Sequence, residues 1–116
     1  MNRKNTKQRV LRARLEDARF FFEEDRKKKL EDLVEILKGV TFQKTLGTSH
    51  EKVNRIVALA EFLAAEVCPD KIRHASRAAW LCKADLVTQM VYEFPELQGI
   101  IGSYYADHSG EDPEIC

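Results

Sequence analysis

The stretch from Thr48 to Pro69 constrains the fold most strongly, because it holds both ends of a helix and an apolar stripe between them. Thr48 precedes Glu51 by three residues, which is the spacing of a capping box, and Pro69 cannot continue a helix. This stripe has the period of an amphipathic helix with one buried face. Its apolar residues are Val53, Ile56, Val57, Ala60, Leu63, Ala64 and Val67.

The same period recurs along the rest of the chain. Gly39 can end one helix in a left-handed cap, and Asp70 can cap the start of another. Helices are therefore expected over 5–26, from Leu30 to Gly39, from Asp70 to the residue before Pro95, and from Pro95 onward. The first of these has its expected inward stripe at Leu11, Leu15, Ala18 and Phe22, and we expect Phe20, Phe21, Phe22 and Trp80 in the core or at its margin.

Glycine and proline are scarce, with five and three residues among 116, and runs of β-branched residues are few. A sandwich or a barrel needs many turns, so this composition argues against both. A chain of this length can bury one core without metal or disulfide staples. The sequence predicts an all-α fold, a compact bundle of about five helices in a single domain over 1–116, with 1–8 disordered.

Charge is balanced overall but unevenly distributed. Residues 1–29 carry 11 basic and 5 acidic residues, whereas 84–116 carry 7 acidic and no basic residues. The asymmetry is compatible with an anionic partner near the N-terminal end and equally with a solvated surface. No apolar run has membrane-spanning length and no secretory signal is present, so we expect a cytoplasmic protein with no membrane partner.

Histidines and cysteines offer no metal site. His50, His74 and His108 match no zinc-ligand spacing with the three cysteines, which form an odd set and are expected to be free thiols. Cys82 lies beside an apolar stripe, where small buried thiols are common and inert, so a nucleophilic role is disfavoured. No glycine-rich phosphate loop exists, and we expect no metal and no cofactor.

Lys83 falls within the apolar stripe of the helix expected after Asp70. One interpretation is that its ammonium reaches solvent or pairs with Glu93 or Asp17, because a buried unpaired ammonium is costly. The other is a cationic pocket, in which Lys83 converges with Arg14 and Lys52, the cations that border the apolar stripes of other helices. The sequence leaves both open.

Asp112, Pro113 and Glu114 are typical of a helix start, with a cap, a first-turn proline and an acid that favours the helix dipole. The chain stops at Cys116. We therefore expect an artificially truncated chain, the product of a shortened gene or one piece of a longer protein, and an exposed apolar edge through which a homodimer can form.

Three runs resemble the β subunit of bacterial glycyl-tRNA synthetase of the two-subunit type: VLRARLEDARFFFEED from Val10, FQKTLGT from Phe42, and AAWLCKADLVTQMVYEFPELQGIIGSYYA from Ala78. The similarity extends from about residue 9 to Glu114. That subunit is several times longer, so the resemblance implies its HD-like helical domain alone.

The HD superfamily includes phosphohydrolases that hold metal ions with a histidine, a His-Asp pair and a later aspartate. The resemblance places Lys52, Cys82 and Lys83 at the first three of these positions, and the later aspartate would lie beyond Cys116. Lysines repel cations, so metal-dependent phosphohydrolase activity is not expected, and Lys83 is expected to replace a metal's charge.

In the resembled enzyme the α subunit performs adenylation and glycyl transfer, and the β subunit supplies tRNA-binding modules. The resemblance thus implies a non-catalytic accessory domain of glycine–tRNA ligase, with tRNA for glycine and the catalytic α subunit as partners. The alternative is a protein-interaction module or a degenerate remnant that binds no RNA. Basic side chains make phosphate contacts, so the nucleic-acid-binding candidates are Arg9, Arg12, Arg19, Lys52, Arg55 and Lys83.

Overall fold

A computed structural model describes residues 3–116, and apart from a short hairpin its regular structure is helical, which confirms the predicted all-α class. The α-helices are α1 (Arg3–Asp25), α2 (Leu30–Val34), α3 (Ser49–Val67), α4 (Ile72–Leu81), α5 (Gln89–Glu93) and α6 (Ile100–His108). Short 3₁₀ turns join them: η1 (Glu35–Gly39), η2 (Pro69–Lys71), η3 (Ala84–Val87) and η4 (Pro95–Leu97). Strands β1 (Thr41–Gln43) and β2 (Gly47–Thr48), which the sequence analysis did not predict, pair antiparallel.

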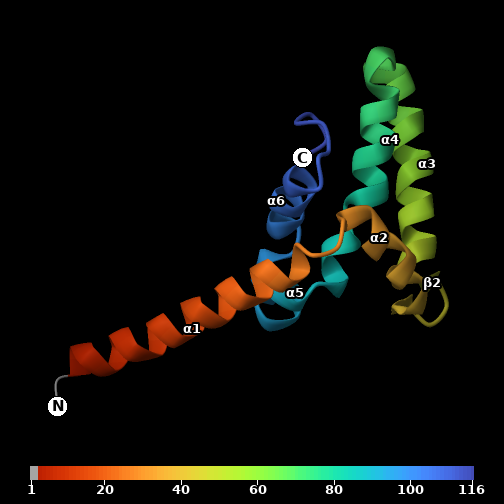
Figure 1. Cartoon of the computed structure of the whole chain (residues 1–116). Coiled ribbons are helices and arrows are strands. Elements are labelled where there is room, and N and C mark those ends of the chain that lie inside the picture. Colours follow the sequence, from red (N-terminus) through yellow and green to blue (C-terminus); the bar gives the residue numbers. More distant parts are fainter. Residues whose placement is uncertain (1–2) are drawn as a thin grey trace.

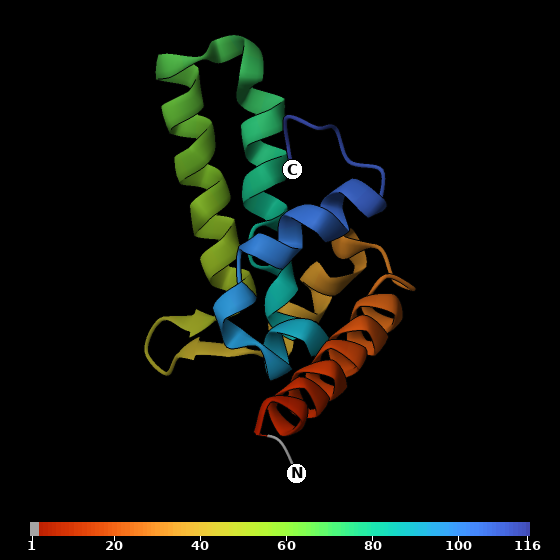
Figure 2. The same cartoon turned by 90° about the vertical axis from the view of Figure 1, so that its left-hand side faces the viewer.

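Helix α3 has the predicted bounds. The Thr48 hydroxyl accepts a hydrogen bond from the Glu51 N–H at 3.2 Å, and the helix ends at Val67, before Pro69. Its neighbour α4 runs alongside it, so that the two form a helical hairpin that stands out from the rest of the chain (Figures 1 and 2). Of the predicted apolar stripe, Val53 at the base of the hairpin is buried, and Leu63 and Val67 toward its tip are exposed.

The single helix predicted between Asp70 and Pro95 is wrong. Helix α4 ends at Leu81, and α5 begins only at Gln89, where the Thr88 hydroxyl accepts from the Val91 N–H at 3.2 Å. Asp70 does not cap α4, since its carboxylate instead accepts from the Cys68 thiol. At this break a side-chain acceptor, the Thr88 hydroxyl, takes the place of a backbone carbonyl of a continuous helix. Apolar periodicity does not reveal such an acceptor.

The helix predicted to open at Pro95 is also interrupted. Its first residues form η4, and Gly99 then adopts a positive φ of 86° before α6 begins. The Asp85 carboxylate fixes this bend, because its Oδ2 accepts from the N–H of Gly99 at 2.6 Å and from that of Gly102 at 3.2 Å. A Cβ at Gly102 would lie 3.0 Å from that oxygen, so a larger residue there would crowd the Asp85 carboxylate.

The core lies where α2, the end of α4, η3, α5 and α6 meet (Figure 2). Phe21, Phe22 and Trp80 pack against it as predicted, whereas Phe20 is 57% exposed. The buried members of this cluster are Leu30, Leu33, Val34, Leu81, Ala84, Met90, Val91, Ile101, Tyr105 and Ala106.

Helix α1 projects away from this core (Figure 1). Every side chain over 3–17 is exposed, so the predicted inward stripe holds only at its C-terminal end, and Leu11 and Leu15 face solvent. Disorder was expected over 1–8; residues 3–8 belong to α1, and residues 1 and 2 lie outside the described residues. Within 3–116 no helix is both long and apolar enough to cross a membrane.

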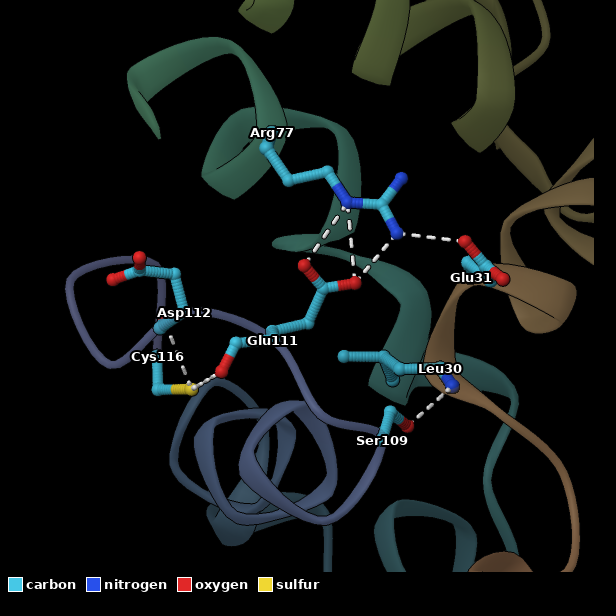
Figure 3. Close-up of polar contacts among 7 residues, drawn as sticks. All are labelled: Leu30, Glu31, Arg77, Ser109, Glu111, Asp112 and Cys116. Atoms are coloured by element: carbon cyan, nitrogen blue, oxygen red, sulfur yellow. Dashed lines mark hydrogen bonds and ion pairs between the residues drawn. The ribbon is translucent and has the colours of Figure 1, made fainter. Parts of the chain in front are cut away.

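Polar contacts hold the C-terminal segment against α4 and α2 (Figure 3). Arg77 donates through Nε and Nη2 to the Glu111 carboxylate and through Nη2 to Glu31 Oε2 at 2.7 Å. Nearby, the Leu30 N–H donates to the Ser109 hydroxyl at 3.0 Å. These hydrogen bonds fix where the segment after α6 runs.

Candidate nucleic-acid interface

The projecting half of α1 is strongly basic. Residues 3–15 contain six arginines and lysines and no acidic residue. Arg9 and Arg12, one helical turn apart, line a shallow surface depression of about 180 Å³ together with Asn5 and Gln8. Such a surface attracts anions, because helical spacing places residues three apart on the same face.

Arg19, the third candidate on α1, differs from the other two. Its Nε lies 3.2 Å from Glu23 Oε1 one turn along, in an ion pair exposed to solvent. Exposed pairs of this kind contribute only a few tenths of a kcal/mol, so the guanidinium remains able to exchange partners. Arg55 has a different contact, because it donates a hydrogen bond to the Leu46 carbonyl oxygen in the β-hairpin at 3.3 Å.

Lys52 and Lys83, 31 positions apart in the chain, line one pocket of about 200 Å³. The Lys52 ammonium lies 3.8 Å from the centre of the Phe42 ring, a cation–π contact that orients it. The remaining lining comes from Phe42, Ser49, Leu86 and Gln98.

Lys83 lies in the break after α4, so its predicted place within the stripe of a continuous helix is wrong. It is half-buried, and within the described chain it forms no ion pair with Glu93 or Asp17. Of the three cations expected to converge, Arg14 lies elsewhere, 4.5 Å over the Phe94 ring. Two of the three cations, Lys52 and Lys83, therefore line the same pocket.

Cys82, the other residue that the resemblance placed at an HD position, lines a different pocket beside Gly102 and Cys116. It is exposed, so the buried setting expected for this cysteine is wrong. Partial desolvation is the main cause that raises the pKa of its thiol above the usual value, so the group is protonated at neutral pH. A protonated thiol is a poor nucleophile and a poor metal ligand. In the described part of the chain, no three histidine, cysteine or acidic side chains are grouped as a metal would need.

Three polar groups of this region escaped the sequence analysis. Ser49 and Gln98 line the lysine pocket, and Asp85 lies close enough to interact electrostatically with Lys83. Burial raises the pKa of Asp85, while the backbone hydrogen bonds from Gly99 and Gly102 oppose this. These groups come from separate elements, so only the tertiary structure brings them together.

Comparison with known proteins identifies the family. A family model described as "Glycyl-tRNA synthetase beta subunit" matches residues 3–116. The chain belongs to this family. The resemblance inferred from the sequence is thereby confirmed.

Curated members of the glycyl-tRNA synthetase β-subunit family are closely similar to this chain. The glycine–tRNA ligase β subunit of Geobacter sulfurreducens is 62% identical over 109 residues, and that of Trichlorobacter lovleyi is 59% identical over 109 residues, each match covering 94% of this chain. The β subunit of Phenylobacterium zucineum is 59% identical over 108 residues, or 91% of this chain. The chain spans 16% of the length of each of these relatives.

Proposed function

We propose that this chain is a non-catalytic accessory region of glycine–tRNA ligase that contributes to tRNA binding in glycyl-tRNA aminoacylation, in the cytoplasm and alongside the catalytic α subunit. The HD-like assignment of the domain is part of the same proposal. The observation that carries it is the projecting half of α1, whose 3–15 segment is basic, free of acids and exposed throughout.

Phosphate contacts from arginine and lysine supply most of the sequence-independent affinity for nucleic acid. Arg9, Arg12 and Arg19 span ten residues of helix, or about 15 Å at 1.5 Å per residue. Figure 1 shows that α1 leaves the body of the domain, so a polyanion can approach this segment. We call the projecting segment of α1, residues 3–17, the arm. It is suited to contact several phosphates along an RNA strand.

Catalysis is not part of the proposal for this chain. Its two HD-like lysines carry no lone pair for a metal when protonated, and partial desolvation raises the pKa of the exposed Cys82 thiol above its usual value. We accordingly disfavour a metal-dependent phosphohydrolase activity. Within glycine–tRNA ligase, adenylation and glycyl transfer are assigned to the α subunit.

The test is a titration of the chain with fluorescent tRNA for glycine at about 50 mM and about 200 mM salt. Affinity should fall steeply with salt, and the double variant Arg9→Gln/Arg12→Gln should lose about 0.7–0.9 of the log–log salt slope for each phosphate contact removed. The matched control is Arg73→Gln, which removes one exposed charge from α4. If the chain does not bind tRNA at the lower salt concentration, the proposal is wrong.

A specific observation favours a second candidate, protein docking for subunit assembly. Large apolar side chains on α1 and α3 are more than half exposed: Val10, Leu11, Leu15, Phe20, Leu59, Phe62, Leu63 and Val67. Apolar docking is nearly insensitive to salt, unlike RNA binding. Sedimentation equilibrium at both salt concentrations separates the two, and it also tests the predicted homodimer through an apolar edge.

A further inference from the structure

We propose that the pocket between Lys52 and Lys83 holds one backbone phosphate of the bound RNA, an inference that rests on the proposed function. Its walls come from five parts of the fold: β1, the start of α3, the break after α4, η3, and the residue that precedes Gly99. A cavity of about 200 Å³ is several times the roughly 30 Å³ that one water takes in the liquid.

Two lysines line this cavity and no acidic residue does. Neither Lys52 nor Lys83 forms an ion pair within the described residues. Asp85 interacts electrostatically with Lys83 but does not line the pocket, and its Oδ2 accepts from the N–H groups of Gly99 and Gly102. Two like charges that share a cavity repel each other, and a bound anion removes this cost.

Ser49 adds a neutral donor to the pocket. The residue is only 5% exposed and lines the pocket, and its backbone N–H donates to the Val40 carbonyl at 2.7 Å. Its Oγ is not among the buried side-chain atoms that lack a partner, so the hydroxyl can be reached from the pocket. A phosphate oxygen in this pocket would accept from that hydroxyl, at the favourable N-terminal end of the 19-residue helix α3.

The donor set is compatible with a phosphate. The fork of an arginine guanidinium matches both carboxylate and phosphate, whereas a lysine ammonium is a common phosphate binder that acts as a point charge with three rotatable donors. Lys52, Lys83 and Ser49 therefore offer donors that can be directed to different oxygens of a tetrahedral group. The Phe42 ring keeps the Lys52 ammonium in place without neutralising it.

The experiment measures tRNA affinity for three single variants. Lys83→Gln should weaken binding about five- to eightfold at about 0.1 M salt and lower the log–log salt slope by about 0.7–0.9. Ser49→Ala removes a donor and no charge, so it should weaken binding about tenfold with the slope unchanged. The matched control Lys44→Gln removes an exposed hairpin charge outside the pocket and should change affinity less than either.

A second measurement uses inorganic phosphate with the wild-type chain, followed by NMR at the amides of Ser49, Lys52 and Lys83. Saturable shifts that Lys83→Gln abolishes, together with the tRNA losses, support the pocket. Normal tRNA binding by both pocket variants overturns the inference and leaves the proposed function intact. Absence of tRNA binding by the wild type overturns both, and phosphate shifts would then assign the pocket to a free anion.

Discussion

Asp25, the last residue of α1, joins three helices through one carboxylate. Its Oδ1 accepts from the Gln89 N–H at 2.9 Å, and its Oδ2 accepts from the Met90 N–H at 3.0 Å and from the Tyr105 hydroxyl at 2.7 Å. It therefore caps α5 from a distance of 64 residues in sequence. Burial and then this hydrogen bond raise the pKa of Tyr105, so its hydroxyl is protonated and donates at neutral pH.

We predict that Asp25→Ala lowers the free energy of unfolding by about 2–4 kcal/mol, because it leaves two helix-start N–H groups and a largely buried hydroxyl without their acceptor. Urea unfolding followed by circular dichroism measures the loss. Asp17→Ala, an exposed carboxylate on the same helix, is the matched control and should cost less than about 0.5 kcal/mol. Equal losses in the two variants would contradict the bridging role.

Asp85 makes the free energy of unfolding depend on pH. Its side chain is 1% exposed and its Oδ1 has no hydrogen-bond partner among the described residues. Burial is the main cause that raises its pKa, so the folded state keeps a proton that the unfolded state has already released. The free energy of unfolding therefore falls as pH rises from the usual aspartate pKa of about 3.9 to the raised one.

We predict that Asp85→Asn removes this dependence while keeping an acceptor for Gly99 and Gly102. The difference in unfolding free energy, variant minus wild type, should increase with pH by about 1.4 kcal/mol for each unit by which burial raises the pKa. Urea unfolding at a series of pH values checks it, with the exposed Asp107→Asn as control. Parallel pH curves for wild type and Asp85→Asn would refute the assignment.

At the scale of elements, Arg77 decides how the C-terminal segment and α2 are fastened to α4 (Figure 3). The Arg77 side chain is 32% exposed and that of Glu111 15%, so their ion pair is partly shielded from solvent, and Nη2 bridges to Glu31 as well. The hydrogen bond from Arg77, and then its charge, lower the pKa of Glu31. A bidentate pair of this kind also fixes the orientation of both partners.

We predict that Arg77→Met lowers the free energy of unfolding by about 1–2 kcal/mol, a value reduced for the solvent screening of a partly exposed pair. Amides after Ser109 should also lose hydrogen-exchange protection, because the segment is released from α4. Arg73→Met, on the exposed side of the same helix, is the control. Wild-type protection in this segment of Arg77→Met would argue against the proposed fastening.

At the scale of the whole molecule, the chain is extended, with dimensions of 62 × 34 × 24 Å. The long dimension reflects α1, whose 3–17 half has no buried side chain (Figure 1). An isolated helical segment of about 15 residues is only marginally stable in water. Buried packing holds this helix near its C-terminal end, through Phe21, Phe22 and Asp25, and Arg14 adds a contact with the Phe94 ring.

We predict that amides over 3–17 exchange by local opening, with protection at least about 100-fold lower than that of buried amides between Leu81 and Ala106. Native-state hydrogen exchange measures this directly. Binding of tRNA should raise protection in the arm if the proposed function is correct. Uniform protection along the free chain would mean that another surface covers the arm, which would favour self-association.

Features that depend only on neighbouring residues could be predicted from the amino-acid sequence. The bounds of α3 follow from a threonine cap and a proline stop, and both act within one helical turn. The all-α class follows from the apolar period and the scarcity of turns. Family membership likewise needed only the residues themselves, since the runs from Phe42 and Ala78 carry it.

The positions where helices break and the apolar faces that are covered depend on tertiary contacts, so the sequence did not predict them. At the end of the interruption between Leu81 and Gln89, Asp25 accepts hydrogen bonds from N–H groups 64 and 65 residues away. At the bend before α6, Asp85 accepts one from an N–H group 14 residues away. A stripe such as that of Leu11 and Leu15 shows that a helix has an apolar face, not that the chain supplies a surface to bury it. The lysine pocket belongs to the same class, because the distance between two side chains far apart in sequence is set by packing and not by any local rule.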